Sequence, residues 1–267
     1  MSTGLLSAMM AAAKRSAEER ERCTGAAVLE AASLRAPRGA DFKARLAGAG
    51  ISIIAECKSR SPSRGIIRHP YDPGAIARGY AAAGAAAISV LTEPTCFDGS
   101  LQHLSAVRDH VDVPVLRKDF ISTSFQISEA RAAGADAVLL IVAGLGNRTL
   151  VRLIADAEQE GLAALVEVHT KEELVQALGA GADVIGVNSR NLKTLAVDLH
   201  VLDELVLGVP SGVTAVAESG LRTASDLRRL SDAGYDAFLI GERFMTASDP
   251  GEALAGLLAE AQHTVTG

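Results

Sequence analysis

The sequence AGADAVLLIV at residues 133–142 shows how this chain is built, because a helix ending in Ala-Gly is followed at once by an apolar strand. The same pattern occurs in AGAAAISVL at 83–91, AGADVIGVN at 180–188 and AGYDAFLIG at 233–241. Glycine provides the left-handed conformation in which a helix ends and the chain turns into the next strand. The repeat predicts regular alternation of helices and parallel strands.

Four further apolar runs lie between these copies: ISIIAEC at 51–57, VPVLRKDF at 113–120, LAALVEV at 162–168 and VTAVAES at 213–219. Nearly continuous apolar runs are typical of parallel strands covered on both faces. Eight strands, each followed by helix-length sequence, indicate an α/β fold of the closed (β/α)8 TIM-barrel type. A doubly wound open sheet is the alternative, but no GxGxxG turn follows the first strand.

The N-terminal segment has a different character. Residues 5–35 are predicted to be helical, Pro37-Arg38-Gly39 breaks the pattern, and a short helix is expected over 41–48. We expect residues 1–50 to form a helical extension and residues 51–267 to form the barrel, within one domain overall.

The composition is that of a globular protein, with 48% hydrophobic and 22% charged residues. The net charge of −6 and the absence of a long basic run argue against nucleic acid as a partner. Three cysteines without a CxxC pair favour a reducing cytoplasm, and neither a signal peptide nor a membrane-spanning run is predicted. We expect a cytoplasmic protein with no membrane association.

Charged residues gather where the predicted strands end, which is where barrel enzymes place their chemistry. The first, third, fifth and seventh strands end with Glu56 and Lys58, Lys118, Glu167, and Glu218. Alternation along a strand places Glu56 and Lys58 on one face and Cys57 on the other, packed outward. Carboxylates and amines in one pocket can shift each other's pKa values for acid–base work.

Loops after the last two strands indicate a phosphate site. Ser219-Gly220 and Gly241-Glu242 occupy the loops that often hold phosphate in barrels, where glycine allows close approach to backbone N–H groups. The loop KSRSPSRG at 58–65 is expected to be a mobile, anion-binding lid. Phe97 and Phe120 follow two strands and favour an apolar wall, whereas His169 shows no metal-ligand spacing.

Taken in order, eight segments make the chain resemble the indole-3-glycerol-phosphate synthase family: IAECKSRSPSRG, SVLTEPTCFDGS, VLRKDFI, ADAVLLIVA, LVEVH, VIGVNSRNL, VAESGL and FLIGERFM. They cover residues 51–246, and the N-terminal helices match the segment that precedes the first strand in that family. The resemblance implies decarboxylative closure of an indole ring in tryptophan biosynthesis. It also implies a small phosphorylated substrate and neither a metal nor an organic cofactor.

The resemblance implies roles for individual residues. Lys118 corresponds to the general acid, Glu167 to the proton acceptor in dehydration, and Lys58 to the amine that engages the substrate carboxylate. Glu56 and Asn188 are expected to orient them. The implied catalytic set is Lys118, Glu167, Lys58, Glu56, Asn188 and Ser219, and the implied binding set is Arg60, Ser61, Arg190, Glu218, Gly220, Gly241, Glu242, Phe97, Phe120 and Leu192.

The sequence departs from the family at Cys96, where a bulky residue is common, and at Glu242-Arg243 beside the phosphate loop. The carboxylate of Glu242 must therefore point away from the phosphate. Three alternatives stay open: a sibling phosphoribosylanthranilate isomerase using a Cys and Asp pair, a Schiff-base aldolase, and a barrel that only binds phosphate metabolites. The oligomeric state is expected to be a monomer or a weak oligomer.

Overall fold

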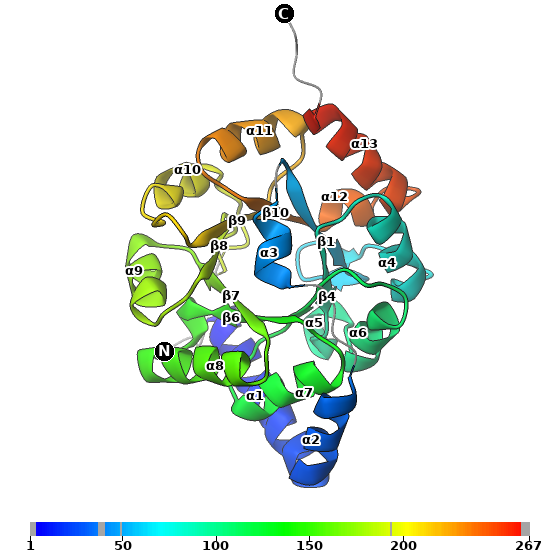
Figure 1. The fold of residues 1–267 in the computed structure, drawn as a ribbon, viewed down its shortest axis with the longest axis vertical. Helices are drawn as coiled ribbons and strands as arrows, with labels where there is room; N and C mark the ends of the chain where they lie inside the picture. The colour runs from blue at the N-terminus through cyan, green and yellow to red at the C-terminus, as the bar shows by residue number, and fades with distance from the viewer. Residues whose placement is uncertain (1–3, 37–40, 49, 193, 263–267) are drawn as a thin grey trace, which may run out of the picture.

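Eight parallel strands close into a barrel in the computed structural model, which describes residues 4–36, 41–48, 50–192 and 194–262 (Figure 1). The spatial order is β1-β10-β9-β8-β7-β6-β5-β4, so each barrel strand pairs with the next barrel strand along the chain and the last pairs with the first. The barrel strands are β1 (Ser52–Cys57), β4 (Ala87–Leu91), β5 (Val115–Lys118), β6 (Ala137–Ile141), β7 (Ala163–Val168), β8 (Val184–Asn188), β9 (Thr214–Glu218) and β10 (Ala237–Ile240). The predicted TIM barrel is confirmed.

A ring of helices covers the outside of the barrel, as Figure 1 shows. One principal helix follows each barrel strand: α4 (Pro73–Ala82), α6 (Leu101–Arg108), α7 (Ser124–Ala132), α8 (Asn147–Gln159), α9 (Lys171–Gly179), α10 (His200–Val206), α11 (Ala224–Asp232) and α13 (Pro250–Gln262). Short helices stand in the loops beyond three strands: α5 (Pro94–Phe97), the 3-10 turn η1 (Val142–Gly144) and α12 (Glu242–Met245). In the described part of the chain, no helix combines the length and apolar character needed to cross a membrane.

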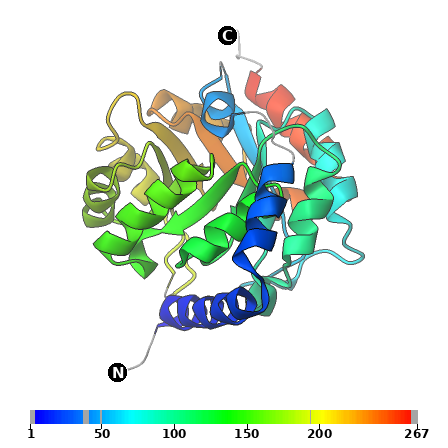
Figure 2. The ribbon, with the colours of Figure 1, turned by 60° about the horizontal axis from the view of Figure 1, so that its bottom comes forward.

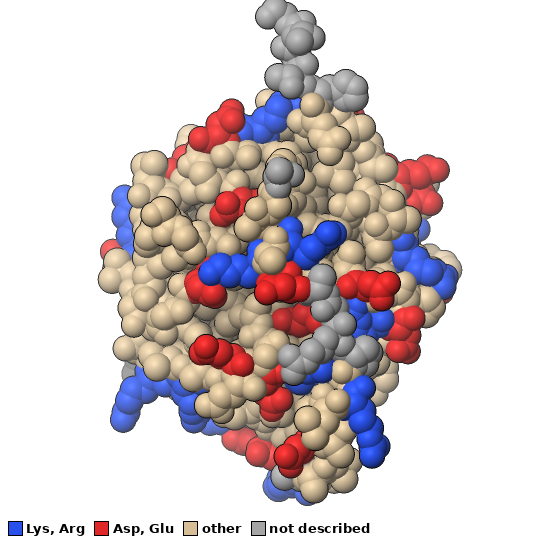
Figure 3. Space-filling model, viewed as in Figure 1, with Lys and Arg blue, Asp and Glu red and all other residues tan. Residues whose placement is uncertain are grey.

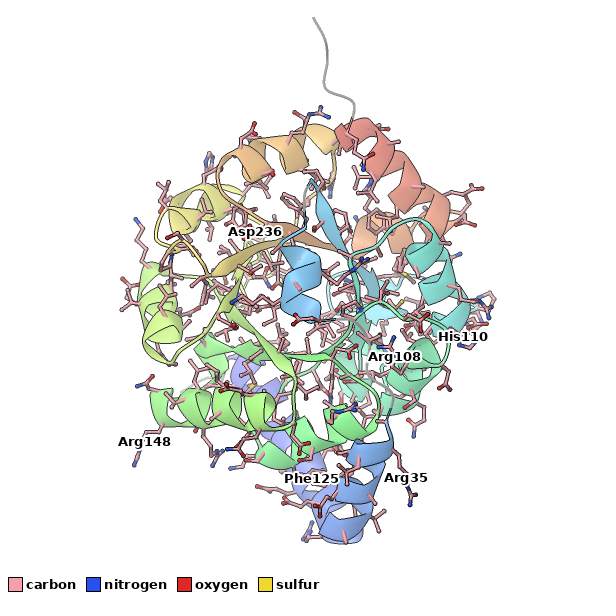
Figure 4. All side chains as sticks on the ribbon, in the orientation of Figure 1. Arg35, Arg108, His110, Phe125, Arg148 and Asp236 are labelled. Carbon is pink, nitrogen blue, oxygen red and sulfur yellow. The ribbon has the colours of Figure 1, made fainter. Side chains whose placement is uncertain are left out.

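The repeated motif has a structural role beyond ending a helix. Asp136 follows Gly134, and its Oδ2 atom accepts a 2.8 Å hydrogen bond from the backbone N–H of Val115, where β5 begins. Asp236, labelled in Figure 4, accepts a bond of the same length from the N–H of Ala215 near the start of β9. These carboxylates accept hydrogen bonds from backbone N–H groups at the amino ends of the strands. The charged residues predicted to form the site lie at the opposite, carboxyl ends.

The N-terminal segment forms three helices: α1 (Leu5–Cys23), α2 (Ala26–Arg35) and α3 (Phe42–Leu46). The helix predicted over residues 5–35 is therefore interrupted, because Thr24 and Gly25 take extended backbone angles. The predicted break at residues 37–39 lies outside the described residues. The boundary between extension and barrel at residue 50 stays a prediction.

Helices α3 and α1 lie at opposite ends of the barrel, whereas α2 packs against α7 in the outer ring. Helix α3 contacts β1 and β4, and it lies over the amino ends of the strands, facing the viewer in Figure 1. Helix α1 crosses the other end, as the rotated view in Figure 2 shows, and Arg20 binds both carboxylate oxygens of Glu129 on α7 at 2.6 and 2.7 Å. Figure 3 shows Lys, Arg, Asp and Glu interspersed over the described part of the face that carries α3.

The predicted lid after the first strand contains a small hairpin. Strands β2 (Arg60–Ser61) and β3 (Gly65–Ile66) pair antiparallel between β1 and α4. Gly65 has a φ of 70°, a left-handed conformation that glycine adopts without steric cost. The hairpin holds the lid sequence at the carboxyl end of the barrel.

Candidate active site

A pocket of about 650 Å³ opens at the carboxyl ends of the strands. Most of the residues that the sequence singled out line it, although they come from seven different strands and their following loops. They are Glu56, Lys58, Ser61, Phe97, Lys118, Phe120, Glu167, Asn188, Arg190, Leu192, Ser219, Gly220, Gly241 and Glu242. Glu218 and Arg60 are not among the lining residues, although Glu218 contacts Lys118, which is.

Lys118 is surrounded by three carboxylates. Its Nζ atom donates a 2.7 Å hydrogen bond to Oε2 of Glu218 and lies 3.9 Å from Glu56 and 4.0 Å from Glu167. Burial alone would lower the pKa of Lys118, but the charges of Glu218, Glu56 and Glu167 outweigh burial and raise it well above the ordinary value. Lys118 is therefore a stable ammonium ion.

Glu218 is the carboxylate whose protonation is easiest near neutral pH. Burial and the charge of nearby Glu167 raise the pKa of Glu218 to about 7, although Lys118 opposes the shift. Its Oε1 atom is buried and has no hydrogen-bond partner among the described residues. That atom occupies the space where a side chain at Gly186 would begin, so glycine at this position of β8 makes room for the carboxylate.

A second pair of charges stands beside the first. Lys58 donates a short hydrogen bond to Oε1 of Glu56, which confirms that these two side chains share one face of β1. Burial would raise the pKa of Glu56, but Lys58 and Lys118 outweigh burial and lower it. Gly241 lies against the Glu56 carboxylate, and a Cβ at this position would collide with it.

Glu167 is held by a histidine as well as by Lys118. His169 Nε2 lies 3.3 Å from Oε1 of Glu167, and Asn188 also forms a hydrogen bond with this carboxylate. Burial would raise the pKa of Glu167, but the contacts with His169 and Lys118 dominate and lower it to about 2. Glu167 is therefore ionised across the physiological range.

Aromatic and aliphatic side chains form one wall of the pocket. The rings of Phe97 and Phe120 lie 6.4 Å apart, tilted by 43°. Glu93 fixes the start of α5 by accepting hydrogen bonds from three successive backbone N–H groups, the last of them that of Phe97. The prediction missed the contribution of α1, whose residues Leu5, Leu6 and Met9 also line the pocket.

The loops after β9 and β10 present backbone to the pocket. Ser219 and Gly220 both take left-handed angles, with φ values of 69° and 75°. Such angles are costly for serine and mark backbone that the surroundings hold in place. Ser189 donates a 3.0 Å hydrogen bond to the carbonyl of Ser219, and Gly241 immediately precedes α12.

Arg190 lines the pocket as predicted, but Arg60 does not. The side chain of Arg60 is exposed on β2, whereas Arg64 from the same loop lines the pocket and donates hydrogen bonds of 2.7 and 3.1 Å to Oε1 of Glu242. The Glu242 carboxylate is thereby engaged by a cation. Arg222 and Arg243 also line the pocket, so two further positive side chains stand beside the glycine loops.

Cys57 faces away from the pocket, as predicted. Its thiol is fully buried and its Sγ atom lies 4.0 Å from the carbonyl oxygen of Pro73 in α4. Burial raises the pKa of this thiol far above its ordinary value, with the charge of Glu56 adding to the effect. Cys57 is therefore a packing residue of the barrel exterior.

Comparison with known proteins finds one family over most of the chain. The family model described as indole-3-glycerol phosphate synthase matches residues 6–257. A protein of that name from Mycobacteroides abscessus is 47% identical over 264 residues, covering 98% of this chain and 97% of its own. Relatives from Rhodococcus jostii and Mycolicibacterium vanbaalenii, also named indole-3-glycerol phosphate synthase, are 50% and 52% identical, covering 91% and 86% of this chain and 91% and 84% of their own.

Solved structures with distant sequences share the fold. KGPDC from Streptococcus mutans is 12% identical, with a TM-score of 0.62 over 80% of this chain and 98% of its own. Thiamine phosphate pyrophosphorylase from Pyrococcus furiosus is 19% identical, with a TM-score of 0.59 over 80% of this chain and 97% of its own. These likenesses concern the barrel alone. The family model and the relatives decide the assignment: the chain belongs to the indole-3-glycerol phosphate synthase family.

Proposed function

We propose that this protein converts 1-(2-carboxyphenylamino)-1-deoxy-D-ribulose 5-phosphate to indole-3-glycerol phosphate, carbon dioxide and water. It would thereby act as a decarboxylating lyase of tryptophan biosynthesis. The observation that carries the proposal is the position of Lys118 among Glu218, Glu56 and Glu167 inside a single pocket with an aromatic wall. The reaction requires an acid, a base and a binding place for an aromatic ring. Lys118, the carboxylates and the aromatic wall supply these three.

Lys118 supplies the acid. As the aromatic carbon that bears the carboxylate attacks the ketone carbon, the ammonium of Lys118 gives its proton to the ketone oxygen, which becomes a hydroxyl. Carbon dioxide then leaves without the bonding electron pair, which returns to the ring and restores its aromaticity. After regaining a proton, Lys118 protonates the departing hydroxyl as water. Acid catalysis by one group contributes about 10² to 10⁴ in rate.

Glu167 supplies the base of the dehydration. It takes the proton that is lost as the hydroxyl leaves, and its lowered pKa ensures that it starts in the ionised form. A carboxylate with a pKa near 2 is a weak base. Substrate entering beside Lys118 separates the ammonium from Glu167, and this loss of a positive neighbour raises the basicity of Glu167 at the moment it is needed.

Charge complementarity supports the binding mode. Lys58 lines the pocket and is suited to bind the substrate carboxylate, with Glu56 and Asn188 orienting the amines and hydroxyls. The phosphate would rest on the backbone of Gly220 and Gly241, a setting in which glycine permits close approach.

Four arginines line the pocket that would hold the phosphate. Arg64, Arg190, Arg222 and Arg243 all line the pocket and can offset the phosphate charge of about −1.5 to −2. Arg60 is exposed and stays a proposed contact from the lid loop. Its neighbour Ser61 is buried at the pocket.

The aromatic wall positions the reacting ring. Phe97, Phe120 and Leu192 line the pocket, so they can hold the aniline ring against the ketone carbon while excluding water. Holding two reacting groups in the correct orientation removes entropy from the barrier and can contribute several kcal/mol.

Two other chemistries fit the site less well. An isomerase with a catalytic Cys and Asp pair would need Cys57 in the pocket, but that thiol packs against α4. A Schiff-base aldolase needs a neutral amine, but three carboxylates stabilise the charged form of Lys118. Irreversible trapping of substrate by borohydride would favour the aldolase.

The remaining parts of the proposal concern the setting of the enzyme. We propose a cytoplasmic enzyme that needs neither metal nor organic cofactor, has no nucleic-acid partner, and is a monomer or a weak oligomer. Three free cysteines agree with a reducing compartment. Light scattering after gel filtration measures the oligomeric state, and activity after dialysis against a chelator tests independence from metal.

Purified protein provides the test of the function. Incubated with the linear substrate, it should produce the fluorescence of indole-3-glycerol phosphate, and its gene should restore growth without tryptophan to a strain lacking this step. Absence of both product and growth, with soluble folded protein, would refute the proposal.

A further inference from the structure

His169 lies between two carboxylates directly behind the proposed base. Its Nε2 atom is 3.3 Å from Oε1 of Glu167, and its Nδ1 atom is 3.2 Å from Oε2 of Glu173. The imidazole is largely buried, with 13% of the side chain exposed. The roles proposed above for the reacting groups do not use this side chain.

The local structure is built to hold this ring. His169 follows the last residue of β7, and Glu173 stands in the first turn of α9. Oε2 of Glu173 also accepts a 2.7 Å hydrogen bond from the backbone N–H of His169. Thr170 caps the helix by accepting a hydrogen bond from the N–H of Glu173. Backbone and ring of His169 are thus fixed together by one carboxylate.

Carboxylate oxygens lie close to both ring nitrogens of His169, at 3.2 Å from Nδ1 and 3.3 Å from Nε2. A neutral imidazole carries only one N–H group, whereas the imidazolium ion carries two. Within the described residues Nε2 has no aligned hydrogen-bond acceptor, so its contact with Glu167 is an ion pair that depends on ring protonation. Burial would lower the pKa of His169, but the close contacts with the carboxylates of Glu167 and Glu173 raise it to about 10.

Charged side chains from three elements of the described structure lie next to one another here. Glu167 from β7 and Glu173 from α9 face the ring, and Lys118 from β5 lies on the far side of Glu167 at 4.0 Å. Glu167 is therefore held between two cations. When substrate displaces Lys118, the ring of His169 is the cation that stays in contact with Glu167.

We infer that His169 is a positioning residue which, as an imidazolium ion anchored by Glu173, fixes the orientation of Glu167 and keeps it ionised until it accepts the proton from the substrate. The inference rests on the proposed function, because it assigns the carboxylate of Glu167 to proton removal. His169 itself touches no reacting atom. Its effect is on the charge of Glu167, and that effect depends on pH.

Three variants separate this role from a merely structural one. His169→Phe removes both N–H donors, His169→Gln keeps a polar side chain without charge, and Glu173→Gln removes the anchoring charge but keeps an acceptor. Glu172→Gln is the matched control, because Glu172 is an exposed carboxylate in the same helical turn. For each protein, kcat/KM is measured between pH 5 and 7.5 and divided by the wild-type value, which cancels the ionisation of the substrate.

Loss of the imidazolium lets burial raise the pKa of Glu167 into the measured range. The ratio for His169→Phe should therefore fall by at least about 3-fold from pH 7 to pH 5. His169→Gln should fall in the same direction, Glu173→Gln should fall less, and the ratio for Glu172→Gln should stay constant. Circular dichroism confirms that each variant is folded. Ratios that are lowered equally at every pH would show a structural role alone and overturn the inference.

A second measurement does not depend on turnover. Nitrogen-15 NMR of the wild-type protein, with His169→Gln used to identify the signal, should show the His169 ring protonated at pH 7.5. An ordinary histidine, with a pKa of about 6.5, is mostly neutral at that pH. A neutral ring would overturn the inference, whereas a protonated ring in a protein that forms no indole-3-glycerol phosphate would refute the proposed function and leave the ion pair standing.

Discussion

Lys118 and Glu218 form a 2.7 Å hydrogen bond across the barrel, although they stand 100 positions apart in the chain. Lys118 ends β5 and Glu218 ends β9, and three strands separate these two on either side of the closed sheet. Only barrel closure brings these side chains together. The proposed chemistry therefore depends on barrel closure, because Glu218 positions the ammonium of Lys118. Together with Glu56 and Glu167, Glu218 also raises the pKa of Lys118.

Replacing Glu218 with Gln should change how stability depends on pH. The pKa of Glu218 is raised in the folded state to about 7. Its contribution to stability is therefore fully present at pH values below its pKa in the unfolded chain, and it is lost as the pH rises through about 7. Relative to wild type, Glu218→Gln should gain about 1 to 3 kcal/mol of unfolding free energy between pH 5 and pH 8. Urea unfolding at the two pH values measures this, and a difference that does not vary with pH would contradict the raised pKa.

Alanine at Gly186 should displace the Glu218 carboxylate. A Cβ there would collide with Oε1 of Glu218, so Gly186→Ala should lower kcat and destabilise the barrel by about 1 to 3 kcal/mol. Gly256→Ala serves as the control, because a Cβ at that position in α13 meets open space. This substitution should raise the free energy of unfolding by about 0.5 to 1 kcal/mol, since alanine is favoured over glycine inside a helix. Equal behaviour of the two variants in activity and thermal unfolding would show that Gly186 does not make room for Glu218.

The proposed phosphate loop is tested by Gly220→Ala. Gly220 has a φ of 75°, and a Cβ would press on Val197, so the loop must shift and KM should rise about 10-fold or more. Gly212→Ala is the matched control, because Gly212 has a φ of 90° but no neighbour within 4 Å and is not among the pocket residues. Both variants should lose similar stability from backbone strain, about 1 kcal/mol or more, but only Gly220→Ala should bind substrate poorly. An unchanged KM in Gly220→Ala would show that the phosphate binds at a different place in the pocket.

Several parts of the site follow from the sequence alone. Each of three apolar runs ends in a charged residue, and this pattern predicted that Lys118, Glu167 and Glu218 lie at the carboxyl ends of strands. Such positions share one rim in a parallel barrel. Alternation along β1 correctly placed Lys58 with Glu56 and turned Cys57 outward. These predictions depend only on local period and strand order.

The features that escaped prediction depend on side-chain positions across the barrel. No local pattern shows that Gly186 makes room for Glu218, since the two residues come from neighbouring strands and meet only in the correct register. The pairing of Arg64 with Glu242 joins residues 178 positions apart. For His169, the spacing to Glu173 across the start of a helix was a usable signal, because i and i+4 side chains meet there.

The most direct test of the account is the kinetics of Lys118→Ala. If Lys118 is the general acid, it acts where charge develops on the ketone oxygen, so kcat should fall by about 10² to 10⁴ while affinity for indole-3-glycerol phosphate changes little. Lys58→Ala should raise KM as well, because its amine is proposed to grip the substrate carboxylate. Product fluorescence measures turnover, and titration with product measures affinity. Near wild-type kcat in Lys118→Ala, with only affinity lost, would make Lys118 a binding residue and contradict the mechanism.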